Sequence, residues 1–571
     1  MKNRTSRRTM SLSLAAVMVL VALAATACGS NKSSSSKNPT TATSSGNSGG
    51  VVNGGNEGRS YSTLRVTWDQ PDYMDPGLAY TVAAWQILWN VYGGLLGYKH
   101  AGGSGGATLV PYLASSLPKI TNGGKTYNFT LRKGLKYSNG QAVKASDFPY
   151  TIERDFKMDS PGVGFFSAIK GVSGANGYAA TKKGHISGIK ANDATGKITI
   201  TLDHPEADFA AILATEFAAF VPTGTPASDQ SAKGGPPADG PYMVKAYNAT
   251  RSFTVVRNPQ FQASKIPTVP RGNPDKVVGK IITDPTAAME TVLNGQSDYD
   301  FQPIPNDRLA TIQKQHGSQL KIYTPADMYY IFLNNRIAPF NNIKARQAVE
   351  YGLDRQAMVQ FFGGLGQPTQ NLLPPNYPQY KKTSAYTYDM NKAKSLAKAS
   401  GTTGQSVTVY GVNTDPSKSV VEYVASQLTK MGWKANVKLL AHGVYFTTIG
   451  NQATKAQAGY ADWYQDYPNP IDWFDTLWNG NRITQTHNNN YGNVDVPSIN
   501  KEIERLKATP TTTPAQNSAW AKIDNELVVK YATTVPYINR SGTDFFSPKM
   551  DMSCYQFHVL YQWDFSTSCQ K

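Results

Sequence analysis

The chain has 571 residues, 40% of them hydrophobic, and it carries 56 lysines and arginines against 39 aspartates and glutamates. This length exceeds what a single hydrophobic core organises, so we expect two or three domains. The formal net charge of +17 can indicate a nucleic-acid partner, but the sequence has no run of five basic residues and no nucleic-acid motif. We therefore expect no nucleic-acid binding. The positive charge is instead typical of a basic exported protein that lies near an anionic cell envelope.

Residues 1–27 are typical of a secretory signal peptide. A basic start precedes an apolar run from Leu12 to Ala27, which ends in small residues and is shorter than the roughly 20 residues that span a membrane. Cys28 comes next, and this junction resembles a bacterial lipoprotein box, in which the cysteine receives lipid and becomes the mature N-terminus. We expect Cys28 to hold the protein outside the cytoplasm, anchored to the outer face of the plasma membrane. Because Ala25 stands where the box usually has leucine, a plain secretory signal cut nearby is the alternative.

Residues 28–60 are predicted to be the lipidated cysteine followed by a disordered tether. Ser, Gly, Thr and Asn dominate this stretch, and its few apolar residues cannot bury enough surface to offset the entropy lost on ordering. A flexible coil of this length reaches about 30 Å. The tether would therefore hold a folded body away from the membrane.

Ordered structure is expected from Tyr61 onward. The patterns predict a strand over 62–67, a helix over 81–96, strands over 125–131 and 198–202, and a hairpin of 242–247 with 252–257. The clearest unit is a strand over 406–410, a helix over 417–431 that ends before Gly432, and a strand over 436–440. This β-α-β crossover implies a parallel pair of strands. We therefore predict an α/β protein.

The catalytic motifs in the sequence are unconvincing. Gly124-Lys125-Thr126 lacks the earlier glycine of a phosphate loop and precedes a strand instead of a helix. The Gly-x-Ser-x-Gly matches at 46–50 and 102–106 fall in glycine-rich coil, where a nucleophile elbow is not formed. The seven histidines are scattered, and no His-Glu-x-x-His or Cys-x-x-Cys occurs. We expect no enzyme, no catalytic residue, no metal and no cofactor, although a triad assembled in space escapes such a search.

Two further cysteines, Cys554 and Cys569, lie near the C-terminus. In an exported protein an even number of cysteines indicates a disulfide, which here would pin the C-terminal segment. Two free, buried thiols are the alternative.

Several blocks along the chain together carry a family resemblance. They are residues 61–66 and 73–79, LRKGLKYSNGQAVKASDF at 131–148, DGPYMV at 239–244 with 257–259, and 330–336 with 339–340, 346–349 and 353–355. In this order they resemble bacterial extracellular solute-binding proteins of family 5, the peptide- and nickel-type receptors of ABC importers. The resemblance covers residues 61 to about 550. It implies a type II periplasmic-binding-protein-like α/β fold, with two lobes, a hinge and an extra inserted domain.

The resemblance also implies a division of the chain. Residues 61–100, about 205–305 and about 500–571 would form lobe I, residues 101–204 the inserted domain, and residues 306–499 lobe II. A ligand would lie between the two lobes, which close on it around the hinge.

The segment WYQDYPNP at 463–470 is the predicted binding segment. It resembles the family's Ala-Asp-Tyr-Pro-Asp-Pro, whose first Asp pairs with the α-ammonium of a peptide in peptide-binding members. The matching residue is Asp466, because a cation that leaves water needs a carboxylate partner. Aromatic walls would come from Trp463, Tyr464 and Tyr467. Two further expected ligand residues, in segments that border the cleft in the family, are Tyr73 and Asn334.

Other roles for these acids stay open at this point. Asp466 could instead cap a helix that starts at Ile471, and Asp462 is a competing carboxylate four residues earlier. The remaining acids, Asp472 and Asp475, are expected on a helix surface. No single Arg or Lys stands out as a partner for the carboxylate of a peptide.

The resemblance implies a receptor for dipeptides or oligopeptides that acts as a monomer with a membrane permease and separate ATPase subunits. A nickel chelate, haem or an oligosaccharide is the alternative cargo. Two other classes are an exported hydrolase, which would show turnover, and a signalling receptor or peptide chaperone with no transport role.

Overall fold

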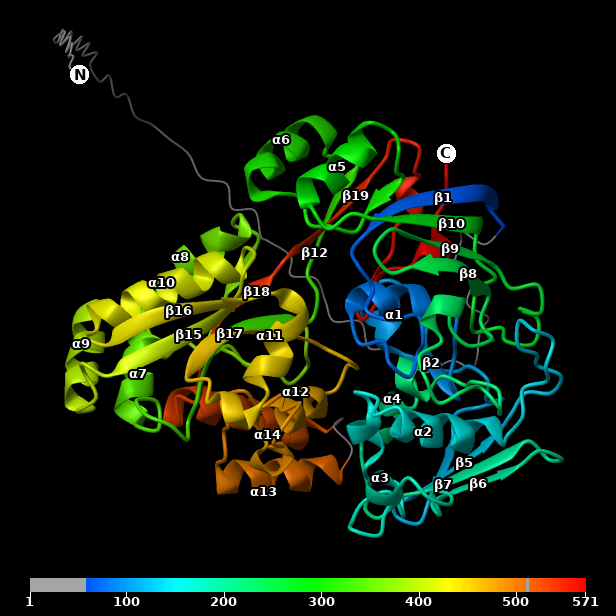
Figure 1. Ribbon diagram of the computed structural model, residues 1–571, viewed down its shortest axis with the longest axis horizontal. Helices are drawn as coiled ribbons and strands as arrows, with labels where there is room; N and C mark the ends of the chain where they lie inside the picture. Colours follow the sequence, from blue (N-terminus) through cyan, green and yellow to red (C-terminus); the bar gives the residue numbers. More distant parts are fainter. Residues whose placement is uncertain (1–57, 510–512) are drawn as a thin grey trace, which may run out of the picture. The chain divides into compact units, whose positions relative to one another are not determined.

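The computed structural model describes residues 58–509 and 513–571, and Figure 1 shows their helices and strands. The expected signal peptide, Cys28 and most of the expected tether lie outside the described residues. The structure therefore does not test these three predictions. Among the described residues, no helix is both long enough and apolar enough to cross a membrane.

The first large element is a seven-stranded sheet, around which we define lobe I. Its order is β12 (Leu320–Tyr323), β19 (Gly542–Phe546), β11 (Tyr299–Asp300), β1 (Tyr61–Trp68), β10 (Pro274–Ile281), β9 (Ser252–Arg257) and β8 (Tyr242–Asn248). The central strand β1 runs parallel to β10 and β11, and its alternate residues Leu64, Val66 and Trp68 are buried. The pairing of β8 with β9 confirms the predicted hairpin.

The second large element is a six-stranded sheet, around which we define lobe II. Its order is β14 (Gly366–Pro368), β18 (Thr534–Arg540), β13 (Asp327–Leu333), β17 (Ala458–Tyr464), β15 (Ser406–Val412) and β16 (Lys434–Leu440). The helix α10 (Ser417–Lys430) connects the parallel strands β15 and β16 and buries Val420, Val424 and Leu428. The predicted β-α-β crossover is therefore confirmed (Figure 1).

A four-stranded sheet lies inside the expected insert, with the order β4 (Lys119–Thr121), β5 (Thr126–Thr130), β7 (Lys197–Thr201) and β6 (Ile189–Asn192). The helices α2 (Asp147–Lys157), α3 (Tyr178–Thr181) and α4 (Phe209–Ile212) accompany it. Its side chains Tyr127 and Ile200 belong to the same apolar core as β1 of lobe I. The insert thus packs on lobe I and shares its core.

The remaining helices of the described chain surround the two large sheets. In lobe I they are α1 (Val82–Leu88), α5 (Pro285–Leu293) and α6 (Asn306–His316). In lobe II they are α7 (Ile343–Gly352), α8 (Arg355–Val359), α9 (Met390–Ala399), α11 (His442–Ile449), α12 (Pro470–Trp478), α13 (Pro497–Lys507) and α14 (Pro514–Asn525). Two short hairpins complete the set: β2 (Leu96–Tyr98) with β3 (Leu109–Pro111), and β20 (Phe557–His558) with β21 (Gln562–Trp563).

The helix expected over 81–96 is shorter than predicted and ends at Leu88. The chain turns at Gly93 and Gly94, where other groups approach the backbone closely. A Cβ atom on Gly93 would lie 2.2 Å from the ring of Tyr112. The apolar residues after Leu88 therefore enter the core from irregular backbone and β2. Their spacing is the same as in a helix, so the sequence pattern alone does not reveal where the helix ends.

The chain passes twice between the two large sheets. Residues 324–326 join β12 to β13, and Ser541 alone joins β18 to β19. The two crossings are neighbours, because β12 pairs with β19 and the Arg540 backbone N–H donates to Asp327 Oδ1 at 3.0 Å. The two lobes are thus connected by a pair of adjacent short segments (Figure 1).

The lobes do not divide at residues 306 and 500, where the boundaries were expected. The helix α6 and strand β12 lie with lobe I, where Leu309 and Leu320 share an apolar cluster with Phe545 of β19. Conversely, α13, α14 and β18 lie with lobe II, since Ile503 and Trp520 belong to its core. The boundaries therefore shift to the two crossings, because pairing between distant strands decides membership.

The structure joins Cys554 and Cys569 in a disulfide, with their Cα atoms 5.8 Å apart. Both cysteines are buried, and the hairpin of β20 and β21 lies between them. Nearby, the Arg59 guanidinium pairs with Asp551 at 2.7 Å. These contacts fix the last residues of the chain beside the start of β1.

Candidate ligand-binding site

One edge of the six-stranded sheet gathers the ends of several strands. The parallel strands β15, β16 and β17 end there, and the antiparallel β13 begins and β18 ends at the same edge. In open α/β sheets, ligands bind outside the carboxyl ends of parallel strands. The predicted binding segment leaves β17 at this edge and continues into α12.

Asp466 is a buried carboxylate at this edge, with 8% of its surface exposed. Its Oδ2 accepts a hydrogen bond from the Tyr80 hydroxyl of lobe I at 2.7 Å. Among the described residues, no Lys, Arg or His forms an ion pair with it. Burial raises the pKa of Asp466 to about 7, and the Tyr80 hydrogen bond opposes this rise. Asp466 therefore joins the two lobes through a carboxylate that has no cationic partner among the described residues.

Asp472 is a second carboxylate beside the first and is fully buried. Its Oδ2 accepts the backbone N–H of Asp466 at 3.0 Å and the indole N–H of Trp463 at 3.2 Å. Burial, and then the negative charge of Asp466, raise its pKa well above the ordinary value. The expectation that Asp472 lies on a helix surface is wrong, because α12 is buried on nearly all sides.

The helix-cap alternative for Asp466 is also wrong. Asn469 is the N-cap of α12, and its side-chain oxygen accepts the backbone N–H of Ile471 at 3.0 Å. Asp475, likewise expected on the surface, is buried instead. It pairs with Lys507 at 2.9 Å and accepts the Arg482 Nε–H at 2.7 Å. The competing carboxylate Asp462 lies within β17, accepts the Tyr460 hydroxyl at 3.2 Å, and has its pKa raised by burial.

The three aromatic residues of the segment occupy different surroundings. Trp463 is half-buried beside Asp472, and the Tyr464 hydroxyl shares a hydrogen bond with the hydroxyl of Tyr329. Tyr467 is fully enclosed and belongs to the apolar core of lobe I, where its hydroxyl donates to Asp208 Oδ2 at 2.6 Å. Tyr467 is therefore placed to connect the lobes, which argues against the predicted role as a ligand wall.

Gln465 provides another connection within the same segment. Its side-chain amide donates to the backbone carbonyl of Val559 in lobe I at 2.9 Å, and its oxygen accepts the Tyr377 hydroxyl at 2.6 Å. Three consecutive side chains of the binding segment, Gln465, Asp466 and Tyr467, thus make hydrogen bonds to lobe I.

The structure does not bring Asn334 to the other predicted site residues. It follows the far end of β13, seven residues from Asp327, and its amide donates to the backbone carbonyl of Ala456 at 2.9 Å. At about 3.4 Å per residue, this distance along a strand exceeds 20 Å. Asn334 therefore ties the end of β13 to the segment that leads into β17, and its placement argues against the expected ligand contact.

Tyr73 lies in the loop after β1 and is 38% exposed. Asp72 organises this loop by accepting the backbone N–H groups of Tyr73 and Tyr80 and the Thr81 hydroxyl. The residue of the loop that reaches Asp466 is Tyr80, which sequence reasoning missed. Tyr80 directly follows the block at 73–79 that resembles the family. This adjacency could have marked it as a candidate site residue.

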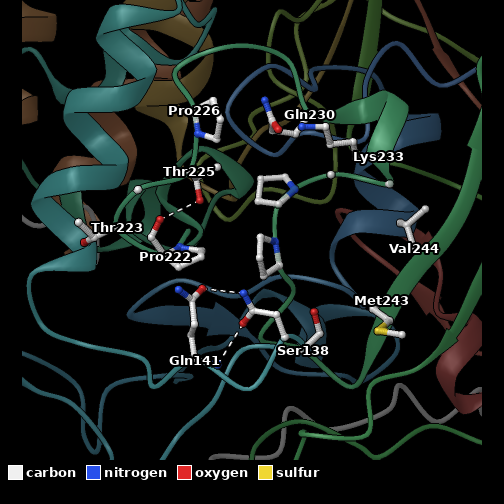
Figure 2. A pocket seen from close by; sticks show the side chains of 16 residues that line it. Ser138, Gln141, Pro222, Thr223, Thr225, Pro226, Gln230, Lys233, Met243 and Val244 are labelled. Atoms are coloured by element: carbon white, nitrogen blue, oxygen red, sulfur yellow. Dashed lines mark hydrogen bonds between the residues drawn. The ribbon is translucent and has the colours of Figure 1, made fainter.

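A groove of about 580 Å³ lies elsewhere, between the insert and the start of β8 (Figure 2). Prolines and polar side chains such as Thr225 and Gln230 line it, with Lys233 as its one basic side chain. None of the predicted binding residues lines this groove. Within the described residues, no cluster of three His, Cys, Asp or Glu side chains is arranged to hold a metal ion.

The chain belongs to the bacterial extracellular solute-binding proteins of family 5, because the model for the middle region of this family matches residues 108–485. This agrees with the resemblance that the sequence blocks carry.

Curated relatives and solved structures are similar to this chain at low sequence identity. The glutathione-binding protein GsiB of Salmonella choleraesuis is 26% identical over 361 residues, and the match covers 60% of this chain and 66% of that protein. The structure is similar to that of the clavulanic acid biosynthesis oligopeptide binding protein 2, with a TM-score of 0.81 and 23% identity over 90% of this chain and 96% of the other. It is also similar to DppA from Helicobacter pylori, solved in complex with the peptide STSA, with a TM-score of 0.74 and 21% identity over 89% and 98%. These likenesses support the type II periplasmic-binding-protein-like fold.

Proposed function

We propose that this protein is the substrate-binding component of an ABC importer and captures short peptides outside the cell membrane. The observation that carries the proposal is Asp466, a buried carboxylate at the edge between the lobes with no cationic partner among the described residues. The ammonium group of a peptide would supply the missing cation. A buried ion pair is favourable only when both charges are present and hydrogen-bonded.

The comparisons with known proteins support the binding of a peptide. GsiB is named as a glutathione-binding protein, and DppA from Helicobacter pylori was solved with a peptide. Because the chain spans just under two thirds of the length of GsiB, the cargo of this protein is a proposal and is not carried over from that relative.

Capture would use the two neighbouring crossings at 324–326 and Ser541 as a hinge. Closure would bring lobe I onto the binding segment, where Tyr80 and Asp208 contact Asp466 and Tyr467. The contacts that unite the lobes would then form around the bound ammonium, so that ligand binding and closure stabilise one another.

The proposed location follows from the N-terminal residues. The signal peptide would export the chain, and a lipid on Cys28 with its tether would hold the monomer near a permease. Energy would come from separate ATPase subunits, since the sequence lacks a convincing phosphate loop.

The test uses a random tripeptide pool, with free or acetylated N-termini, and the full mature chain. Native mass spectrometry and thermal shift should detect stoichiometric binding of the free pool and much weaker binding of the acetylated pool. Asp466→Asn should lose this preference. The control Asp307→Asn, at an exposed position on α6, should keep it.

Binding of a nickel chelate, haem or an oligosaccharide with no binding of the free pool would contradict the peptide assignment. Cleavage of the pool would contradict the receptor assignment and favour a hydrolase.

A further inference from the structure

The two lobes also meet around residues 206–208, which follow the insert and lead into α4. The side of lobe I is set by Phe209, the first residue of α4, which belongs to its apolar core. Glu206 forms an ion pair at 3.2 Å with Lys507 of α13 in lobe II. The Ala207 backbone N–H donates to the Lys507 backbone carbonyl at 2.8 Å. We call these two bonds the Lys507 contact, because lobe I holds this residue by both its side chain and its backbone.

The charges of the Lys507 contact are balanced within the protein. The Lys507 ammonium also pairs with Asp475 of lobe II at 2.9 Å, and the second oxygen of Glu206 lies 3.1 Å from Nε2 of His204. The side chains of Glu206 and Lys507 are 6% and 4% exposed. Burial by itself would raise the pKa of Glu206, but the hydrogen bond to His204 and then the charge of Lys507 outweigh it and hold that pKa below its ordinary value. The ion pair is therefore complete without any added cation.

Two side chains beside this contact pack into the core of the opposite lobe. Ala207 of lobe I packs against the apolar core of lobe II. Tyr467 of lobe II belongs to the core of lobe I, and its hydroxyl donates to Asp208 Oδ2 at 2.6 Å. A buried aromatic side chain removes about 150 to 250 Å² from water. If the lobes opened, hydration would compensate the separated charges but not the exposed apolar surface, so this packing favours the closed arrangement.

The Lys507 contact is separate from the proposed ligand site and from the hinge. It contains none of the predicted ligand residues, and neither crossing, at 324–326 or Ser541, takes part in it. Its bonds therefore attract the lobes equally with and without cargo. A contact of this kind does not distinguish between ligands, but it shifts the equilibrium between the open and closed forms.

We propose that the Lys507 contact is a latch that keeps the lobes closed in the ligand-free protein, so that its transient opening controls both entry and release of cargo. This inference goes beyond the proposed function and does not depend on the identity of the cargo. A closed ligand-free form excludes ligand for most of the time, so association slows in proportion to the small open fraction. The same bonds slow dissociation from the closed complex. The latch therefore slows the exchange of cargo more than it changes affinity.

The experiment measures hydrogen exchange of the Ala207 backbone N–H in the full mature chain, freed of ligand by unfolding in guanidinium and refolding without reductant. This N–H donates across the lobes, so opening exposes it to water. We expect it to exchange at least 100-fold more slowly than an unstructured amide. Glu206→Gln should speed this exchange at least tenfold. The Asn413 N–H, which donates to Leu440 within lobe II at 2.8 Å, should keep the parental rate in the variant.

The matched control is Glu502→Gln, which makes the same chemical change at a more exposed position of α13, where Glu502 pairs with Arg505. It should leave the Ala207 exchange unchanged. Glu206→Asp keeps the charge on a shorter side chain and should give an intermediate rate; it also serves if Glu206→Gln does not fold. Fast exchange at Ala207 in the parent, the parental rate in folded Glu206→Gln, or an equal change in the control would overturn the inference.

A kinetic measurement separates a latch from a ligand contact. With the random tripeptide pool, Glu206→Gln should raise both the association and the dissociation rates at least threefold in stopped-flow fluorescence, whereas loss of a ligand contact changes mainly dissociation. An association rate no faster than that of the parent would overturn the inference. If the parent does not bind the pool, the proposed function fails, and the exchange of Ala207 still decides whether the latch exists.

Discussion

Two groups of buried acids lie at the boundary between the lobes, and they differ in their partners. In the first group, Asp475 and Glu206 meet the ammonium of Lys507 at 2.9 and 3.2 Å. In the second group, Asp466 and Asp472 meet hydroxyl, indole and backbone N–H donors but no described cation. We call these the matched group and the unmatched group.

The pKa values follow this difference. Burial by itself would raise the pKa of Asp475, but Lys507 and Arg482 outweigh it and hold that pKa below its ordinary value. Burial raises the pKa of Asp466 to about 7, with only the Tyr80 hydroxyl to oppose it. The matched group is therefore complete as a structural connection between the lobes, whereas the unmatched group has the chemistry of a cation-binding site.

The largest expected effect concerns stability and the matched group. Lys507→Met would leave Asp475 and Glu206 buried with less compensation, so the free energy of unfolding should fall by about 3 to 5 kcal/mol. Urea denaturation measures this loss. The control Lys501→Met, on the exposed face of the same helix, should change stability by less than about 0.5 kcal/mol. An equal effect of the two substitutions would remove the distinction between the groups.

The next effect concerns binding and the unmatched group. Asp466→Asn should weaken binding of tripeptides with free N-termini about 100-fold, equivalent to about 3 kcal/mol, because a desolvated ammonium loses its carboxylate. The same variant should unfold no more easily than the parent, because it removes a buried carboxylate that pairs with no cation in the described part of the chain. Isothermal calorimetry and urea denaturation test the two halves. A destabilised variant with unchanged affinity would reverse our assignment of the two groups.

The pH dependence should separate binding from stability. The carboxyl of Asp466 has a pKa of about 7 in the folded protein and about 4 when unfolded, so only the folded form holds its proton between these values. Its contribution to stability is therefore present at low pH and is lost as the pH rises toward 7.

Binding of an ammonium group requires the ionised carboxylate, so affinity should change in the opposite direction. It should fall by up to about tenfold for each pH unit below 7. Calorimetry at pH 6 in two buffers with different ionisation enthalpies should detect proton release on binding, and Asp466→Asn should abolish that release. Affinity that is constant from pH 5 to pH 8 would contradict the account.

The smallest expected effect comes from the lobe I contact to the unmatched group. Tyr80→Phe removes the hydroxyl that donates to Asp466 at 2.7 Å. Loss of one such hydrogen bond should weaken peptide binding by about 1 kcal/mol, or roughly fivefold. The variant should also shift the pH midpoint of binding upward, because this bond lowers the pKa of Asp466. A downward shift would mean that the hydroxyl does not stabilise the ionised form.

Local periodicity was sufficient to predict much of the fold. The crossover of β15, α10 and β16 and the hairpin of β8 and β9 were found because strand and helix spacings are local properties. The boundaries between the lobes were not found, because β18 and β19 are separated by one residue and yet join different sheets. Pairing with distant strands decides that division, and the sequence near Ser541 does not record it.

The part of the site that is local in sequence was predicted, and the part that depends on distant residues was not. Asp466 stood out because its neighbours in sequence form a recognisable segment. Tyr80 lies 386 positions away from it, so only the folded chain brings the two residues together. Asp472 was misplaced because an acid in a helix normally lies on its exposed face, whereas α12 is buried nearly all round.

The most direct measurement of the central claim is a crystal structure of the mature protein grown with the random tripeptide pool. The account predicts a peptide between the lobes with its ammonium nitrogen within about 3 Å of a carboxylate oxygen of Asp466. A peptide bound elsewhere, or one whose ammonium contacts another acid while Asp466 keeps only its contact with Tyr80, would contradict it.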